Sequence, residues 1–485
     1  MKKIYFFIWV CSVYSFYLSQ DSRDVVRYSQ TQYYGTARFE SMAGSFGALG
    51  ADLSSVQINP AGLGRYSKSV FSFNLQNTTV KNQSTFNNQQ STDQINLFRL
   101  NNLGVLICND VSENNRGFIF NQIAFSYNRV ENLKDQYSYK GQQFASLLDE
   151  FAAMASGLSS DDIYAYLPFT SALAWDTYSI DSDNENGYIP RLTANDVIHR
   201  RNIENKGGIS EYNFNISGNY NHKLYVGGNI GLKSVRYFED YYHYEHAPYN
   251  DALSLDSFQY DYHLKTKGSG FNFKIGAIYL PYESLRIGIS IHTPTFLKLK
   301  DYYSANMISY HKDTTYSIPE DYQPKGEYKY KLTQSPKMIL SVAYIFQTKG
   351  AINVDVDIIP YQWSRFASTD DTNYEPYDYT TTNNDVKKLL KTGINARIGG
   401  ELALFSHLFL RAGFAYYSNA YHNNIAKVKP QLIGSGGMGF RWKKNAFDFA
   451  VKYENRTFYY YAFSQSETKI KQNRLSFSLS YSLFF

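Results

Sequence analysis

Residues 35–64 read GTARFESMAGSFGALGADLSSVQINPAGLG, and they decide how the chain is organised. They hold six of its 31 glycines, and glycine permits tight turns and close backbone approach. Pro60 fixes its own φ and pushes Asn59 out of the helical region, so Asn59-Pro60-Ala61-Gly62 predicts a turn. Alternating strands follow the stretch. We therefore expect a compact irregular element that packs inside something larger.

The segment before this stretch is typical of an exported protein. Lys2 and Lys3 precede a mostly apolar run over residues 4–18, which predicts a secretory signal peptide at residues 1–20. This run is too short for a retained transmembrane helix. We assign residues 21–67 to a tether and a plug. The formal charge is +5 with scattered basic residues, which gives no support for a nucleic-acid partner.

The composition favours a membrane β-barrel. The chain has 46 Tyr and 34 Phe but a mean hydropathy of −0.43. A barrel gives this combination because one face of each strand meets lipid, the other meets water, and aromatic girdles lie at both interfaces. After the signal peptide only Cys108 remains, so no intramolecular disulfide can stabilise the exported chain. No later segment reaches about 18 consecutive apolar residues, which excludes transmembrane helices.

Period-2 alternation and turn residues predict an all-β, 14-stranded antiparallel transmembrane barrel over residues 68–485. An even strand number is expected of a bacterial barrel. The predicted strands are residues 68–80, 93–107, 116–132, 208–221, 222–239, 265–281, 282–300, 327–347, 349–360, 392–405, 406–418, 430–443, 444–460 and 470–485.

The connection lengths support this assignment. Every even-numbered connection is short, whereas the odd-numbered ones are medium or long: 81–92, 133–207, 240–264, 301–326, 361–391, 419–429 and 461–469. Barrels alternate short periplasmic turns with longer extracellular loops. The parity therefore predicts that both termini lie in the periplasm.

The last strand alternates fully. Leu475, Phe477 and Leu479 occupy one face, and Ser476 and Ser478 occupy the other. The alternative is an amphipathic edge strand of a soluble sandwich. A signal peptide together with this alternation at the extreme terminus favours the barrel.

Several motifs resemble one family. The small-residue turns ending in Asn59-Pro60-Ala61-Gly62 resemble the N-terminal plug of the FadL family of outer-membrane channels, and residues 286–295, RIGISIHTPT, resemble its mid-barrel strand. The lead-in at residues 27–30 is similar to the Bacteroidetes branch. The resemblance implies a lumenal plug and passive uptake of hydrophobic small molecules such as long-chain fatty acids. Phe485 resembles the terminal aromatic read by the barrel-assembly machinery.

The longest loop contains a candidate ligand groove. Phe144, Leu147, Leu148 and Phe151 fall at helical spacing, and apolar surface on an extracellular loop needs a partner. One interpretation is an entry groove for a lipid-like ligand, which the resemblance favours. The other is a helix that packs on neighbouring loops.

Neither a metal site nor a catalytic site is predicted, and no cofactor is expected. His243 and His246 flank Glu245, but no compact third ligand group follows. Four acidic residues could bind calcium, but a solvated loop explains them better: Asp370, Asp371, Glu375 and Asp378. The chain lacks Gly-x-Ser-x-Gly, Walker A, His-Glu-x-x-His and Cys-x-x-Cys.

Glycines inside the predicted strands have two interpretations. They make room for a plug, or they provide bends that barrel curvature needs. The residues are Gly227, Gly228, Gly231, Gly399, Gly400, Gly434, Gly436, Gly437 and Gly439.

The predicted function is an outer-membrane channel with a hydrophobic small molecule and outer-membrane lipid as its partners. In the resembled family the ligand leaves sideways through a kinked strand. The third predicted strand holds only Gly117 and no proline, so the sequence does not reveal such an opening. The alternative is a docking or assembly protein of a type IX secretion system, which some barrels of this kind serve.

Overall fold

The computed structural model describes residues 21–30, 32–112, 117–183, 187–192, 197–247, 255–369, 377–422, 428–464 and 466–485. The expected signal peptide lies outside these ranges. The described strands form a closed antiparallel barrel with fourteen wall strands, as predicted. The barrel closes where the first and last strands pair, with Val70 opposite Phe484.

Several wall strands are broken into two segments. In chain order they are β1 (Val70–Phe86), β2 (Gln89–Asp110), β3 (Phe118–Asn132) continued by β4 (Asp135–Gln143), β7 (Val197–Tyr220), β8 (Leu224–His246), β9 (Leu255–Tyr282), β10 (Leu285–His292) continued by β11 (Phe296–His311), β13 (Lys325–Thr333) continued by β14 (Lys337–Ile345), β15 (Gly350–Pro360) followed by β16 (Arg365–Ser368), β17 (Thr392–Phe405), β18 (Leu408–Tyr417), β19 (Gln431–Trp442), β20 (Asn445–Tyr461) and β21 (Glu467–Phe484). The short strands β5 (Ile180–Ser182), β6 (Tyr188–Pro190) and β12 (Thr315–Ser317) belong to loops.

The two faces of the wall differ as the alternation predicts. On β7, Phe214 and Ile216 are exposed on the outer face, whereas Asn213, Asn215 and Ser217 are buried toward the lumen. An apolar outer face beside a polar inner face is the arrangement of a barrel that spans a bilayer. The sequence therefore sets the register by burial, because a slip of one residue would turn the asparagines toward lipid.

The strands run further than the sequence indicates on the side away from the C-terminus. The first connection, expected over residues 81–92, is a two-residue turn at Asn87 and Asn88, because β1 and β2 continue to Phe86 and from Gln89. The long loop expected over residues 133–207 likewise contains β4 and the start of β7. Along these extensions the outer residues are polar, so apolar alternation does not mark them.

Proline breaks three neighbouring wall strands at one level. Pro294 separates β10 from β11, Pro336 separates β13 from β14, and Pro360 ends β15. Proline has no N–H to donate to a ladder. The first two breaks face each other, because His292 pairs with Lys337 below them and Phe296 pairs with Thr333 above them.

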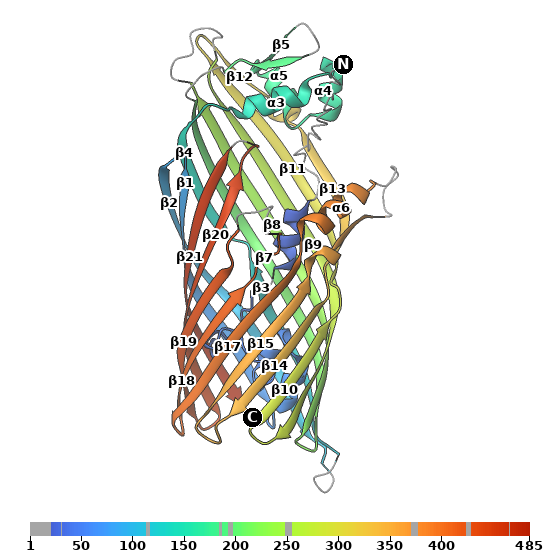
Figure 1. Ribbon diagram of the computed structural model, residues 1–485, viewed down its shortest axis with the longest axis vertical. Coiled ribbons are helices and arrows are strands. Elements are labelled where there is room, and N and C mark those ends of the chain that lie inside the picture. The colour runs from blue at the N-terminus through green and yellow to red at the C-terminus, as the bar shows by residue number, and fades with distance from the viewer. Residues whose placement is uncertain are drawn as a thin grey trace, which may run out of the picture.

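Helical segments fill the barrel and cover one end (Figure 1). Within the lumen lie α1 (Ser22–Ser29), α2 (Ala37–Ser41) and the 3-10 helices η1 (Leu53–Gln57) and η2 (Pro60–Arg65). Over the rim opposite the C-terminus lie α3 (Leu147–Ala155), α4 (Ser160–Tyr166) and α5 (Ser171–Asp176). The others are η3 (Glu320–Tyr322), η4 (Tyr361–Trp363) and α6 (Thr380–Leu389). None of the described helices is both long and apolar enough to cross a membrane.

Candidate functional site

The turn at Asn59 anchors the irregular element to the barrel wall. The Asn59 side chain caps η2 by accepting a hydrogen bond from the Ala61 N–H at 3.1 Å. Its amide donates to the Gly47 carbonyl at 2.8 Å and to the Ala277 carbonyl of β9 at 3.1 Å. Pro60 occupies the first turn of η2, where a missing N–H costs nothing. The predicted motif therefore joins two plug segments and one strand.

Buried acidic groups of the wall hold the rest of the element, which we call the plug (residues 32–66). The Asp355 carboxylate on β15 accepts hydrogen bonds from the Phe46 N–H at 3.0 Å and the Gly47 N–H at 3.1 Å. Arg38 of the plug forms an ion pair with Glu401 of β17, with Nε and Oε2 3.0 Å apart. Charged partners make these hydrogen bonds stronger than neutral ones and fix the position of the plug.

Some strand glycines make room for the plug and others do not. A Cβ on Gly227 would lie 2.5 Å from the Pro60 carbonyl carbon, and one on Gly399 would lie 2.5 Å from the Met42 oxygen. Added Cβ atoms on Gly228 and Gly434 would meet nothing within 4 Å. The first interpretation therefore holds at Gly227 and Gly399, whereas the plug gives no reason for glycine at Gly228 and Gly434.

A small polar cavity lies above the plug at the level of the proline breaks. Its volume is about 50 Å³, which is room for one or two water molecules or a small polar group. Lining residues include Tyr33, Lys233, Lys274, His292, Gln334 and Lys337. Lys274 pairs with Glu211. The sequence analysis missed this site, because its residues come from many separate segments spread over residues 29–359.

Two lysines of this cavity lack an acidic partner. Lys233 donates to Thr295 and to Gln334, each at 3.2 Å, and Lys337 donates to the Tyr33 hydroxyl at 3.0 Å. Among the residues that the structure describes, neither ammonium group forms an ion pair with a carboxylate. Burying an ammonium group is costly unless hydrogen bonds or a counter-charge compensate it.

Above this cavity an apolar cluster lies beside buried charged groups, such as the Arg27–Asp24 ion pair of α1. Val25 and Tyr28 of α1 pack with Val235, Leu297 and Tyr330 of the wall in one buried cluster. The residues predicted to form a tether therefore include a helix that fills the middle of the barrel (Figure 1).

The strand pairing of the wall is interrupted to one side of the plug, although β4 still packs against β2, where the Ser138 N–H donates to Asp93 at 2.7 Å. The ladder between β2 and β3 ends at Asn102 opposite Asn128, and β4 pairs with β7 instead. Within the described part of the chain, no ladder joins the rest of β2 to β3 or β4. Asn101 bulges there and donates to the plug's Glu40 at 3.1 Å. The third wall strand is thus interrupted, at Leu133 and Lys134, without a proline.

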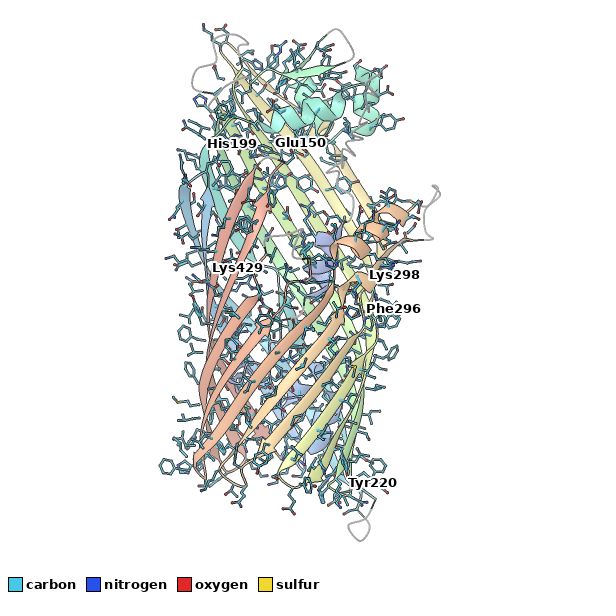
Figure 2. The ribbon with its side chains drawn as sticks, viewed as in Figure 1. Glu150, His199, Tyr220, Phe296, Lys298 and Lys429 are labelled. Atoms are coloured by element: carbon cyan, nitrogen blue, oxygen red, sulfur yellow. The ribbon has the colours of Figure 1, made fainter. Side chains whose placement is uncertain are left out.

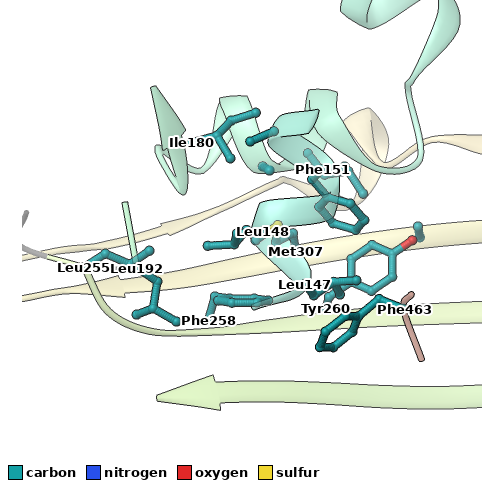
Figure 3. Packing of buried hydrophobic residues seen from close by; sticks show 14 of the residues in the cluster. Leu147, Leu148, Phe151, Ile180, Leu192, Leu255, Phe258, Tyr260, Met307 and Phe463 are labelled. Atoms are coloured by element: carbon teal, nitrogen blue, oxygen red, sulfur yellow. The ribbon is translucent and has the colours of Figure 1, made fainter. Parts of the chain in front are cut away.

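We call the helices over the rim the lid (α3–α5). Three of the four predicted groove residues belong to α3 and face the barrel wall. Leu147, Leu148 and Phe151 are buried in one cluster with Phe258, Tyr260, Met307 and Phe463 (Figure 3). Leu147 and Phe151 also line a pocket of about 80 Å³. Phe144 is 74% exposed and takes no part in it. Because Ser146 caps α3, the chain turns between Phe144 and Leu147.

The acidic residues near the lid have other neighbours than the sequence analysis considered for metal binding. Asp149 completes the capping box of α3, and burial raises the pKa of its carboxyl group. Glu245 is buried next to His243, but His246 lies on the opposite face of β8. His199 lies beside Glu245 and His243 instead, so these three residues form the group that could hold a metal ion. Of the four acidic residues considered for calcium, only Asp378 lies within the described residues, and it accepts a hydrogen bond from the Thr380 N–H at 2.9 Å.

Comparison with solved structures identifies the fold. A FadL homologue of Pseudomonas aeruginosa matches with a TM-score of 0.57 and 13% identity, covering 94% of this chain and 98% of that chain. The toluene transporter TodX of P. putida matches with a TM-score of 0.56 and 12% identity, covering 94% and 99%. No family model and no curated protein matches the sequence. The chain has the fold of the FadL-type barrels, as its sequence motifs predicted.

Proposed function

We propose that this protein is a channel of the cell outer membrane that takes up hydrophobic small molecules passively, with long-chain fatty acids as its substrates. The interruption of strand pairing between β2 and β3 carries this proposal, since a ligand that leaves the lumen there avoids the plug on the axial route. The matched solved structures are described as a FadL homologue and a toluene transporter, which supports a hydrophobic substrate.

The surfaces inside the barrel follow the order that an amphipathic ligand needs. The pocket beneath the lid is lined by Leu147, Phe151 and Tyr260, which suit a hydrocarbon tail. The lumen below it is filled by an apolar cluster around Tyr28 of α1. Transfer of the tail from water to these surfaces is favourable at every step.

The lysines above the plug suit the head group of a fatty acid. A carboxylate at the 50 Å³ cavity would gain charge-assisted hydrogen bonds from Lys233 and Lys337, which donate to neutral groups here, although Glu211 of β7 stands opposite Lys233. The cavity is too small for the whole ligand, so the tail would extend toward the apolar residues above it. A neutral aromatic hydrocarbon would gain nothing from these ammonium groups.

Uptake of an acid and a neutral compound by the same variant separates the two parts of the proposal. We expect Lys233→Met with Lys337→Met to lower the uptake of oleate about tenfold, because charge-assisted hydrogen bonds are lost. Uptake of toluene should stay near the wild-type value. Lys298 is exposed on the outer face of β11 and provides the matched control, Lys298→Met (Figure 2).

Two outcomes would contradict parts of the proposal. Equal loss for oleate and toluene would contradict the head-group site but not the channel. Uptake of neither compound above that of cells lacking the protein would contradict the channel. In that case the docking protein of a type IX secretion system becomes the better hypothesis.

A further inference from the structure

A cluster of metal-ligating side chains lies at the lid end of the wall, separate from the lumenal cavity. His199 on β7 stands opposite Glu245 on β8, and His243 lies two residues before Glu245 on the same face. All three side chains are fully buried. The Glu245 Oε1 atom is 2.7 Å from His243 Nε2 and 3.1 Å from His199 Nδ1. Figure 2 places His199 close to the lid and far from Tyr220 at the other end of β7.

Two ring nitrogens of the cluster lack hydrogen bonds. Nε2 of His199 and Nδ1 of His243 have no hydrogen-bond partner among the described residues, and Nδ1 of His199 contacts Glu245. The His199 ring lies among the rings of Phe86 and Phe463, at centroid distances of 5.9 and 5.8 Å. Burying an imidazole without a partner is costly, and such a group calls for an explanation.

The carboxylate of the cluster is already oriented by the lid. Glu245 accepts a hydrogen bond from the Leu147 N–H at 2.8 Å and another from the Ser146 hydroxyl. Ser146 is also the N-cap of α3. In metal sites such outer hydrogen bonds orient the ligating carboxylate. The same bonds connect the cluster to the first turn of the lid.

We propose that His199, His243 and Glu245 bind a divalent transition metal of the Zn²⁺ class, which pins the lid to the barrel wall. Two imidazoles and one carboxylate are a known zinc ligand set, with a water molecule in the fourth position. Their three ligand atoms lie within 4.8 Å of one another. A tetrahedral zinc site needs roughly 3.3 Å between ligand atoms, so small side-chain shifts suffice. Calcium and magnesium prefer all-oxygen ligands and fit less well.

Titration of the full-length protein with zinc tests the site. The protein is stripped with a chelator in detergent and titrated with ZnCl₂ in a calorimeter. We expect one tight site, and each of His199→Gln and His243→Gln should weaken it by about 100-fold. The matched control is His263→Gln, because His263 forms an exposed pair with Asp240 at 2.8 Å on the outer face. That variant should bind zinc as the wild type does.

A second measurement needs no variant. X-ray absorption at the zinc edge of the loaded wild-type protein should show two imidazole nitrogens and carboxylate oxygen at about 2.0–2.2 Å. Zinc should also protect the lid from proteolysis in the wild type and not in His199→Gln. An all-oxygen shell, or equal affinity in wild type and His199→Gln, would show that the cluster is only hydrogen-bonded.

Discussion

The plug and the lid close the two ends of the barrel by different kinds of contact. The plug is held by polar groups, such as Asn59 on the Ala277 carbonyl and Asp355 on the Gly47 N–H. The lid rests on apolar side chains, with Phe151 against Tyr260 at a ring distance of 5.3 Å. Hydrogen bonds require defined distances and angles, whereas apolar contacts have no direction. The plug is therefore fixed in one position. The lid also forms hydrogen bonds to the wall, from Ser146 and the Leu147 N–H to Glu245, and otherwise rests on apolar side chains such as Tyr260.

We expect the two ends to act differently during uptake. A buried polar network is costly to open, because each separated group loses its partner without gaining water. An apolar contact can be exchanged for the tail of a ligand with little loss. We expect the ligand to displace lid contacts when it enters and to leave the plug contacts intact.

Removal of the plug should have the largest effect. Deletion of residues 35–64 leaves all the wall strands, so the barrel should fold. Its ion conductance in planar bilayers should rise on the order of tenfold, because wide barrels without internal filling leave an aqueous channel. Heat-modifiable mobility serves as the folding control. A folded deletion variant that conducts no better than the intact protein would show that the plug does not close the lumen.

Substitution of one plug side chain should raise the ion conductance by a smaller amount. Asn59→Ala leaves the carbonyls of Gly47 and Ala277 without their hydrogen bonds. Each loss costs about 1–3 kcal/mol, which loosens the plug without removing it. We expect flickering conductance between that of the intact and the deleted protein. Asn121→Ala, on the exposed outer face of β3, is the matched control and should be silent; equal conductance in both would contradict a polar anchor.

A substitution in the lid should weaken the binding of a fatty acid and leave the ion conductance unchanged. Phe151→Ala removes buried aromatic surface from the 80 Å³ pocket and should weaken binding of a fluorescent fatty acid about tenfold. Phe144→Ala truncates a ring that is 74% exposed and should leave the affinity unchanged. If the two variants bind alike, the pocket beneath the lid is not a ligand site.

The sequence predicted those parts of the molecule whose signal is local. Alternation of Phe214 and Ile216 with asparagine and serine marked the membrane-spanning part of the wall, and Asn59-Pro60 marked the plug anchor. The upper wall was missed because its outer face is polar, as at Arg200. The periplasmic position of the termini stays a prediction.

The sites that depend on register could not be predicted. His199 is far from Glu245 in the sequence, and only the pairing of β7 with β8 brings them together. The lysines of the lumenal cavity are likewise brought together only by the pairing of wall strands that are far apart in the sequence. The predicted strands at residues 282–300 and 327–347 run through Pro294 and Pro336, so neither the two breaks nor their opposition was predicted.

The most direct measurement locks the plug to the wall and asks whether transport continues. The Asn353 amide donates to the Ser45 hydroxyl at 2.7 Å, so Ser45→Cys with Asn353→Cys, in a Cys108→Ser background, places two thiols in contact. Uptake of oleate is measured in the oxidised and the reduced protein. Equal uptake is predicted, because the plug stays in place and the ligand leaves between β2 and β3. Uptake that stops on oxidation and returns on reduction would show that the plug has to move.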